Sequence, residues 1–520
     1  MSRRNGLMTV HLTDLAAKQQ TEFDALTSPE ARRELGHFGT SPAVARFMAG
    51  MFDEIAPGTL RILDAGAGVG TLSAAICDRV LRLQDRRRLV FELWEIDPKL
   101  KTRLHSTMHE CQQALISAGH EMEFDIRTDD FVLEHAQPSL FCPATSPKFD
   151  LAVMNPPYFK VRKESEHARL MNHVVHGQPN IYPFFMAIAV DLLVDGGQMV
   201  AITPRSYFSG PYFKRFRKWF FERVTPQQIH VFESRTDTFR DDDVLQENVI
   251  LSATKGGFPA DVVITSCEGR DFTDVDRHTL PSASVVGDAS TDHLVRVPTT
   301  RLEQEIVTAM DCLPLRFREL PFRISTGPVV HFRATEFLRE QRANDTAPLL
   351  WMHNVRPFVT QFPPKNKKPE HVLVSDRTKK LLLPAHRYVL IKRFTAKEER
   401  RRLVAGILEP DQCYSPVVGL ENHLNYVYQP GSGLSKVEAL GLAALFNCAM
   451  VDRYFRTISG NTQVNAAEIR AMPVPELETI RHIGEVLLNS ELPFTDLEGI
   501  VGQALGFSRN FVEQLCESAP

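Results

Sequence analysis

The sequence is poor in cysteine and has no long apolar stretch, and both shortages exclude classes of protein. Eight cysteines occur among 520 residues, with no C-x-x-C pair and no His/Cys spacing typical of a zinc site. A disulfide framework and a bound metal are therefore not expected, and the thiols fit the reducing cytoplasm. No apolar run approaches the ~20 residues of a membrane span, and residues 1–10 lack the apolar core of a signal peptide. We expect a cytoplasmic protein with no membrane contact.

Length and charge give the next constraints. A chain of 520 residues predicts two or three domains. The net charge of -4 does not by itself indicate a nucleic-acid partner. Residues 311–410, however, carry 20 Lys and Arg against 10 Asp and Glu. This basic segment indicates either a module that faces a polyanion or an ordinary solvated surface, and charge alone does not separate the two.

The most informative stretch is residues 149–159, a short apolar run that ends at two prolines. Phe149 to Met154 is apolar except for Asp150, as expected for a strand covered on both faces. Pro156 and Pro157 cannot donate to a ladder, so pairing stops there. The side chain of Asn155 then lies just past the carboxyl end of a central strand, where open α/β sheets bind ligands. An amide, a backbone carbonyl and the Tyr158 ring together suit a planar ring with an exocyclic amino group.

A glycine-rich turn follows an earlier predicted strand. Residues 61–70 read RILDAGAGVG, so a strand feeds a tight loop, and a helix is expected from about Thr71. Glycines allow close approach of the backbone to a ligand. The pattern is not the dinucleotide G-x-G-x-x-G, and Asp64 before the first glycine suits a ligand with a cationic amino group rather than a pyrophosphate. Alone, the loop is weak support for a nucleotide-like ligand.

Two further strand ends carry acidic residues. Glu95 ends the predicted strand 89–94 and can accept from two ribose hydroxyls, whereas Asp97 with Pro98 also reads as a helix N-terminus. Asp129, Asp130 and Phe131 follow the predicted strand 123–127. A carboxylate and an aromatic ring there suit an adenine, although a solvated turn explains Asp129 or Asp130 taken alone equally well. Four successive strand ends therefore carry glycine, acid, acid and Asn-Pro-Pro-Tyr, and this ordered series is more specific than any single member.

In this order, with the Phe38-Gly39-Thr40-Ser41-Pro42 segment before the glycine turn, the chain resembles the gamma class of DNA adenine amino-methyltransferases, the TaqI- and PstI-like modification methylases. The resemblance covers residues 36–255 well and 320–475 more loosely. It implies S-adenosyl-L-methionine as cofactor and a flipped-out adenine in double-stranded DNA as substrate. The cofactor-binding residues that it implies are Phe38, Thr40, Asp64, Ala65, Gly66, Gly68, Glu95, Ile96, Asp130, Phe131 and Asn155.

The same resemblance assigns roles around the base. Catalysis falls to the Asn155-Pro156-Pro157-Tyr158 segment, and Tyr158 with Phe239 would stack on the base. Lys160, Arg162 and Lys163 lie in a basic loop that either follows a phosphate backbone or is plain surface. Lys392 and Arg393 lie in the basic segment and are candidate DNA contacts. Residues 205–223 interleave aromatic rings and cations, which fits nucleic-acid stacking but fits a sheet-covering helix better.

The implied fold class is α/β: a class I methyltransferase domain with a mostly parallel, seven-stranded Rossmann-like sheet, and a C-terminal α+β target-recognition domain. We expect a catalytic domain over residues 1–310 with its core at 36–255, a DNA-recognition domain over 311–475, and a helical segment over 476–520.

The function implied is site-specific N6-adenine methylation, either as a solitary enzyme or beside a separately encoded restriction endonuclease. Glutamine-amide methylation of a protein, guanine methylation of RNA and a DNA-specificity protein with an inactive core are the alternatives. The basic segment disfavours the protein methylases, which are shorter, and the intact Asn155 segment disfavours an inactive core. The recognition sequence and the oligomeric state stay open.

Overall fold

The computed structural model describes residues 11–28, 39–53, 55, 57–136, 149–175, 180–232, 247–258, 260–267, 272–362, 368–395, 399–459, 463–490 and 496–517. The chain divides into two compact units, Met1–Thr299 and Thr300–Pro520, called unit 1 and unit 2 below. Helix α12 (Arg301–Asp311) therefore belongs to unit 2, so this boundary precedes the one expected near residue 310. No described helix is both long and apolar enough to cross a membrane.

Among the described residues, unit 1 contains one sheet of nine strands in the order β3-β2-β1-β4-β5-β7-β6-β8-β9. Strands β1 to β5 are parallel neighbours, and β7 runs antiparallel to both β5 and β6. The expected seven-stranded sheet is thus present and is extended by β8 and β9. The strands are β1 (Gly58–Ala65), β2 (Arg87–Trp94), β3 (Glu121–Arg127), β4 (Phe149–Met154), β5 (Leu193–Pro204), β6 (Val224–Phe232), β7 (Asn248–Lys255), β8 (Asp261–Cys267) and β9 (Asp276–Pro281).

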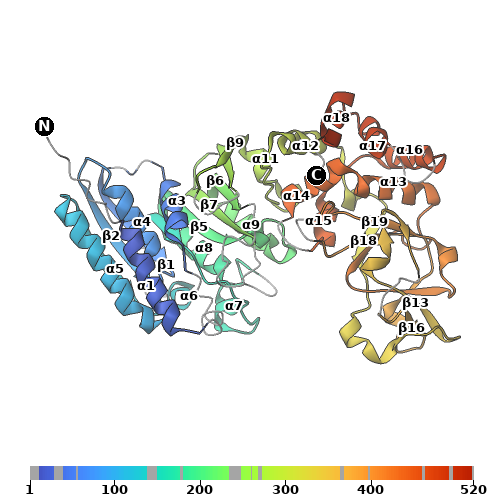
Figure 1. Ribbon diagram of the computed structural model, residues 1–520, viewed down its shortest axis with the longest axis horizontal. Helices are drawn as coiled ribbons and strands as arrows, with labels where there is room; N and C mark the ends of the chain where they lie inside the picture. The colour runs from blue at the N-terminus through green and yellow to red at the C-terminus, as the bar shows by residue number, and fades with distance from the viewer. Residues whose placement is uncertain are drawn as a thin grey trace. The chain divides into compact units, whose positions relative to one another are not determined.

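Helices cover both faces of this sheet, and Figure 1 shows α1, α4 and α5 side by side. Alternate strand residues enter two separate cores, as a side-chain period of two requires. Ala152 and Met154 join the core beneath α8, whereas Leu151 and Val153 join the core beneath α1, α3, α4 and α5. The helices are α1 (Leu12–Leu26), α3 (Pro42–Gly50), α4 (Thr71–Val80), α5 (Pro98–Ser117), α6 (Phe131–Ala136), α7 (Glu166–Leu170), α8 (Tyr182–Leu192), α9 (Lys214–Phe221) and α11 (Ser282–Val285).

Two helices begin as their sequences predict. The Ser41 hydroxyl accepts from Val44 N at 3.4 Å, with Pro42 in the first turn of α3. The Asp97 carboxylate accepts from Lys99 N at 2.8 Å, with Pro98 in the first turn of α5. These caps fix where the chain enters each helix, and α5 begins directly after the Glu95 strand end.

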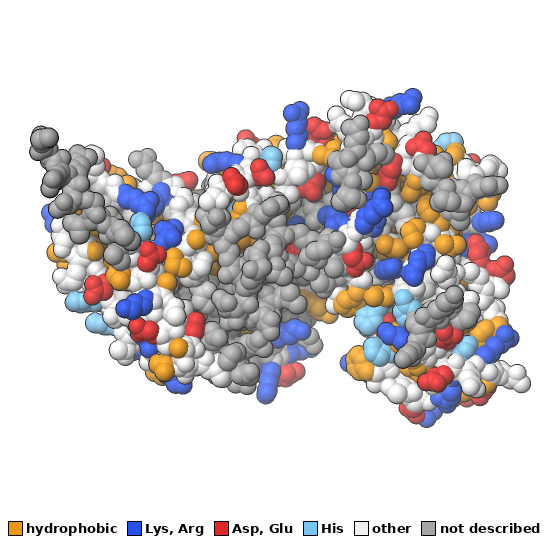
Figure 2. Space-filling model, in the orientation of Figure 1, with side chains coloured by type: hydrophobic (Ala, Val, Ile, Leu, Met, Phe, Trp, Pro, Cys, Tyr) orange, Lys and Arg blue, Asp and Glu red, His pale blue; other side chains and the backbone are white. Residues whose placement is uncertain are grey.

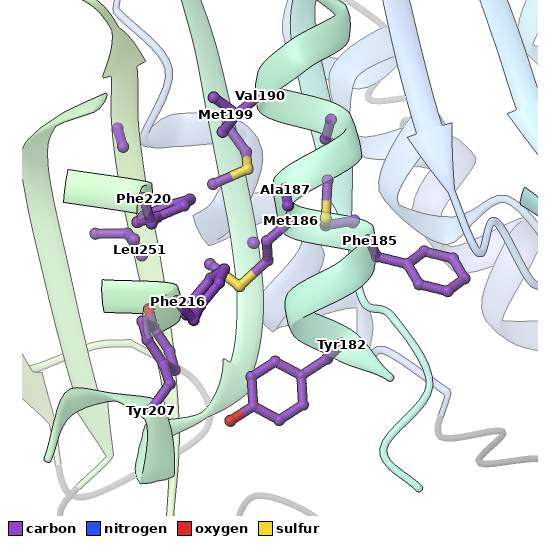
Figure 3. Packing of buried hydrophobic residues seen from close by; sticks show 14 of the residues in the cluster. Tyr182, Phe185, Met186, Ala187, Val190, Met199, Tyr207, Phe216, Phe220 and Leu251 are labelled. Carbon is purple, nitrogen blue, oxygen red and sulfur yellow. The ribbon is translucent and has the colours of Figure 1, made fainter. Parts of the chain in front are cut away.

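The aromatic residues between 205 and 223 are core residues. Tyr207, Phe216 and Phe220 are fully buried and pack with α8 and the strands behind it, as Figure 3 shows. The sheet-covering interpretation is therefore confirmed for these rings. The expected single helix is wrong, because the segment is broken into η1 (Arg205–Phe208), η2 (Pro211–Phe213) and α9, where Gly210 and Pro211 interrupt helical bonding.

One cation of this segment is also buried. Arg217 donates from Nη1 to the carbonyl oxygens of Tyr207 and Gly210 at 3.0 and 2.8 Å, and from Nε to that of Asp292 at 3.0 Å. The helix was expected to carry its cations on a basic outer face, but Arg217 is buried and ties η1, η2 and α9 together.

Unit 2 contains a six-stranded sheet in the order β11-β21-β18-β19-β15-β14, a five-stranded sheet in the order β12-β16-β13-β20-β17, and the pair β10-β22, within its described residues. The strands are β10 (Leu315–Arg316), β11 (Arg323–Thr326), β12 (Leu338–Arg339), β13 (Thr346–Leu350), β14 (Val355–Arg356), β15 (Phe358–Thr360), β16 (His371–Leu373), β17 (Leu382–Pro384), β18 (Tyr388–Lys392), β19 (Ala405–Leu408), β20 (Val417–Leu420), β21 (Leu424–Tyr428) and β22 (Pro473–Val474).

Helices follow these strands in unit 2. One continuous helix over 436–455 was expected, but the structure has two that meet at Cys448. The helices after α12 are α13 (Lys436–Asn447), α14 (Ala449–Ile458), α15 (Ala466–Ala471), α16 (Leu477–Leu488), α17 (Leu497–Ala504) and α18 (Arg509–Glu517).

Candidate functional site

The predicted strand ends meet at one edge of the unit 1 sheet. β1 pairs in parallel with both β2 and β4, and Asp64 lies opposite Leu93 on one side and Val153 on the other. Parallel strands end at the same edge, so the loops after them are brought together. The glycine turn, Glu95 and Asn155 are neighbours for this reason.

A cavity lies at this edge, and most of the predicted residues line it. Its wall also contains residues from α1, α5, α7 and α8, which lie far away in the sequence. The lining residues are Gln20, Phe23, Gly39, Thr40, Gly66, Ala67, Gly68, Val69, Thr71, Leu72, Trp94, Glu95, Ile96, Leu100, Asp129, Asp130, Phe131, Asn155, Pro157, Phe159, His167, Ile181 and Phe185.

The glycine turn forms one wall with its backbone. Gly66 and Gly68 have φ values of +83° and +58°, a region that side-chain-bearing residues rarely adopt. The N–H groups of Gly66 and Ala67 both donate to the Trp94 carbonyl at 2.9 Å, which ties the turn to the end of β2. A Cβ added to Gly66 would lie 3.6 Å from the backbone oxygen of Asn155. The turn and the Asn155 segment are therefore in direct contact.

Glu95 is held rigidly at the cavity wall. Its Oε2 accepts from Gly68 N at 2.9 Å and its Oε1 accepts from Asp97 N at 2.8 Å. The side chain is only 5% exposed. These two bonds fix the plane of the carboxylate at the cavity wall.

Asp64 does not line the cavity. It is fully buried behind the turn, where its Oδ2 accepts from the Ser73 hydroxyl at 2.6 Å. Its Oδ1 is buried and has no hydrogen-bond partner. The pKa of Asp64 is raised to about 7, by burial first and also by the negative charge of Glu95, against the lowering effect of the hydrogen bonds with Ser73. The side chain is a buried acid poised near neutral pH.

Asp130 caps α6 and pairs with a histidine. Its Oδ1 accepts from the N–H groups of Val132 and Leu133 at 2.9 and 3.0 Å, and its Oδ2 bonds His167 Nε2 at 2.8 Å. Burial raises the pKa of Asp130, but the bond to His167 and these N–H groups outweigh burial, and the net pKa is lowered. The same bond raises the pKa of His167. Phe131 follows Asp130 in the chain, and the centroid of its ring lies 5.0 Å from that of the Phe185 ring.

The Asn155 amide is held from two sides. Its Nδ2 donates to the Thr40 hydroxyl oxygen at 3.0 Å, and its Oδ1 accepts from the Tyr158 hydroxyl at 2.5 Å. The two hydroxyls hold the amide at the end of β4. In this orientation the amide oxygen is an acceptor at the strand end.

The Tyr158 ring is buried, whereas the expected stacking on a base requires an exposed ring. The ring of Tyr158 is 8% exposed and belongs to the core beneath α8. Its hydroxyl also lies 2.9 Å from the Ile202 carbonyl oxygen, so its single proton is shared between this oxygen and Asn155 Oδ1. Tyr158, Pro156, Ala65 and Asp64 are absent from the cavity lining, whereas Pro157 and the neighbouring Phe159 belong to it. In this arrangement Phe159, 38% exposed, is the aromatic ring of the segment that faces the cavity.

The remaining predicted residues lie elsewhere. Phe38 and Phe239 fall outside the described residues. Lys160, Arg162 and Lys163 are exposed in the segment between β4 and α7. In unit 2, Lys392 is half-buried at the end of β18, and burial followed by the charge of Arg356 lowers its pKa. Arg393 donates from Nη1 to the Asn422 carbonyl at 2.9 Å.

Sequence reasoning missed several lining residues. Gln20 and Phe23 come from α1, and His167 and Phe185 come from α7 and α8. Figure 3 shows the Phe185 ring pointing away from the other labelled core residues of α8. Their local sequence is that of ordinary helix residues, so no signal short of the tertiary arrangement identifies them.

Comparisons with known proteins identify relatives of this chain. Residues 72–239 match the family described as Eco57I restriction-modification methylase. The chain is 36% identical over 477 residues to the type II methyltransferase M.BsuBI of Bacillus subtilis, covering 89% of this chain and 94% of the relative. It is 34% identical over 476 residues to M.PstI of Providencia stuartii, covering 91% and 93%. The solved type IIL restriction-modification enzyme MmeI in complex with DNA shares the fold, with a TM-score of 0.56 and 10% identity over 97% of this chain and 78% of that chain.

Proposed function

Because this chain belongs to the type II methyltransferases, we propose that it transfers a methyl group from S-adenosyl-L-methionine to the N6 amino group of an adenine in double-stranded DNA. The observation that carries the proposal is the Asn155 amide, whose oxygen is fixed at the end of β4, beside the glycine turn. Methylation of host DNA protects it from a separately encoded restriction endonuclease, which is the cellular partner that we infer beside DNA.

The residues at the sheet edge fit this cofactor. Gly66 and Gly68 leave the turn open to a ligand, and Glu95 offers lone pairs to ribose hydroxyls. Phe131 provides an apolar surface for adenine, whereas Asp64, which is buried behind the turn, stays in the proposed set only as a charge near the ligand's amino group. Thr40, Ile96, Asp130 and Ala65 complete the proposed binding set, with Phe38 from outside the described residues. When bound, the cofactor supplies a methyl group on a positively charged sulfur.

The Asn155 segment would activate the base by accepting its protons. The lone pair of an adenine amino nitrogen is delocalised into the ring, which makes the nitrogen a weak nucleophile. Two acceptors, the Asn155 side-chain oxygen and the Pro156 carbonyl oxygen, favour the tetrahedral amine and stabilise the positive charge that develops on nitrogen. Placement in line with the methyl group then matters more than a general base. No cysteine nucleophile is required.

Access to the base requires that adenine leave the duplex stack, which costs a few kcal/mol. We propose that aromatic stacking at this edge offsets the cost, by ~1–3 kcal/mol per ring. Tyr158 and Phe239 remain the proposed stacking residues, and Phe159 is a third candidate because its ring lines the cavity. Stacking on Tyr158 requires its ring to leave the position seen in the structure, where its hydroxyl bonds Asn155.

Transfer of labelled methyl groups to duplex DNA tests the proposal. Wild-type protein, tritiated S-adenosyl-L-methionine and unmethylated plasmid are incubated, and the nucleosides are separated by chromatography. Label is expected on N6-methyl-2′-deoxyadenosine only, and Asn155→Ala should abolish transfer while its circular dichroism spectrum stays close to wild type.

Asn489→Ala, which changes an exposed asparagine at the end of α16, serves as the matched control and should retain activity. Label on cytosine would contradict the adenine assignment. Label on RNA guanine or on a protein glutamine, with none on duplex DNA, would contradict the DNA substrate and favour one of the alternative methyltransferase classes.

A further inference from the structure

Unit 2 contains a buried carboxylate that holds two histidines. Glu421, fully buried, follows β20 directly and bridges to Val329. Its carboxylate accepts from Nδ1 of His331 at 2.8 Å, and from the backbone N–H and Nδ1 of His423 at 2.8 and 2.9 Å. A carboxylate is an acceptor, so Nδ1 of each imidazole is the donor. Each neutral ring then carries its lone pair on Nε2.

The two imidazoles are partly open to solvent. The His331 and His423 side chains are 40% and 30% exposed, and their ring centroids lie 5.9 Å apart. The ring centroid of Trp351 lies 5.6 Å from that of His331, and the ring centroid of Phe394 lies 4.6 Å from that of His423. These contacts limit the rotation of both imidazoles. The geometry therefore presents two oriented, partly exposed imidazole edges side by side.

Cations crowd around this cluster. The Arg393 side chain reaches the Asn422 carbonyl and Gln463, and the Lys368 ammonium lies 4.4 Å from the Trp351 ring centroid. Burial, followed by the charges of Lys368 and Arg356, lowers the pKa of the adjacent His353 against the opposing charge of Glu421. Figure 2 shows pale-blue histidines gathered with Lys and Arg side chains on this part of unit 2.

This charge balance favours an anion over a metal ion. One ligand atom from each of His331, Glu421 and His423 lies within 4.8 Å of the others, a spacing that a metal could use. However, the carboxylate already accepts three hydrogen bonds, and the nearby Lys and Arg side chains repel a dication. The same side chains attract the phosphates of DNA, and an imidazole lone pair accepts from the amino group of adenine or cytosine in the major groove.

We propose that His331 and His423 read base amino groups of the target sequence, that Glu421 is the positioning residue that orients both rings, and that Arg356, Lys368, Lys392 and Arg393 contact the flanking phosphates. The inference rests on the proposed DNA methyltransferase function. It assigns to unit 2 a specific base-reading surface, which is defined by these seven residues. Removal of one reading histidine should relax the preference at its base pair by roughly 5- to 150-fold.

A randomised duplex library tests the assignment. Wild type, His331→Ala, His423→Ala and Glu421→Gln are each incubated with the library and S-adenosyl-L-methionine, and methylated adenines are mapped by long-read sequencing. Each histidine variant should accept additional bases at one position of the methylated sequence. Glu421→Gln should broaden the same positions, because its amide N–H₂ cannot accept from an imidazole N–H. The KM for the cofactor should stay unchanged in all three.

Two controls keep the outcome decisive. Arg509→Ala removes an exposed cation on α18 and should leave the sequence preference unchanged. His331→Ala changes a partly exposed side chain, so it tests the idea even if Glu421→Gln fails to fold. An unaltered preference in both histidine variants overturns the inference while methylation by wild type still supports the proposed function; no methylation of any duplex by wild type removes both.

The metal alternative is measured on the same proteins. Elemental analysis of the purified chain, and titration with Zn²⁺ followed by calorimetry, should detect no stoichiometric ion at this cluster. One ion per chain that is lost in His331→Ala, together with an unaltered sequence preference, would replace the base-reading role by a metal site.

Discussion

The Nδ2 group of Asn155 donates a hydrogen bond of 3.0 Å to the Thr40 hydroxyl, although the two residues are 115 positions apart. Thr40 lies just before α3 and Asn155 just after β4, so the bond joins the segment that precedes the sheet to its centre. An amide can rotate about its side-chain bonds, and the contacts with the Thr40 and Tyr158 hydroxyls together select one position of the Asn155 amide at the strand end.

Thr40→Val should lower methyl transfer by removing that selection. A neutral hydrogen bond contributes about 0.5–1.5 kcal/mol, so kcat/KM is expected to fall by about two- to tenfold. Thr40→Ser keeps the hydroxyl and should remain close to wild type. Steady-state kinetics with duplex DNA as the varied substrate measures the effect. A loss in Thr40→Ser with none in Thr40→Val would show that the methyl group of Thr40, not its hydroxyl, is what matters.

Tyr158→Phe and Tyr158→Ala separate the hydroxyl from the ring. Tyr158→Phe removes the hydroxyl that lies between Asn155 Oδ1 and the Ile202 carbonyl, so it should lower the free energy of unfolding by about 1–3 kcal/mol. Because one of the two contacts that hold the Asn155 amide is lost, activity should fall by about two- to tenfold. Tyr158→Ala also removes the proposed stacking surface, and activity should fall at least tenfold further. Fluorescence of 2-aminopurine at the target position reports base extrusion. If Phe159→Ala alone abolishes extrusion, stacking belongs to Phe159 instead.

Asp64→Asn should change how stability depends on pH. The pKa of Asp64 is raised from 3.8 to about 7 in the folded protein. A raised acid pKa means that the folded state holds its proton more tightly, so the stability of wild type falls as pH rises from 3.8 to about 7. The Asn variant lacks this loss. Thermal unfolding without cofactor should show a gap in favour of the variant that widens from pH 4 to pH 7 and then levels off; a gap independent of pH would contradict the burial argument.

The exposed cations after β4 should contribute to the salt dependence of DNA binding. If Lys160, Arg162 and Lys163 each contact a phosphate, replacing all three by Ala should reduce the slope of log K against log salt by roughly 3. Fluorescence anisotropy with a duplex at several salt concentrations measures the slope. Lys101→Ala, an exposed cation on α5, should leave it unchanged, and an unchanged slope in the triple variant would place the segment away from DNA.

The sequence alone determined the backbone chemistry of the site. Strand-ending prolines, the glycine turn and the helix caps at Ser41 and Asp97 are local signals, because φ limits and missing N–H groups act within a few residues. Parallel strands then carry Gly66, Glu95 and Asn155 to one sheet edge. For this reason the amino-acid sequence is sufficient to predict the series of four strand ends and the family that the series resembles.

Side-chain direction was decided by tertiary packing. Asp64 is buried behind the turn, Arg217 lies inside the segment expected to be basic and outward-facing, and the Tyr158 ring packs beneath α8. Gln20 and Phe23 reach the cavity only because α1 packs on α4 and α5. Residue type sets what a side chain can bond, whereas the partners that it meets come from segments up to a hundred or more positions away, and no local pattern encodes them.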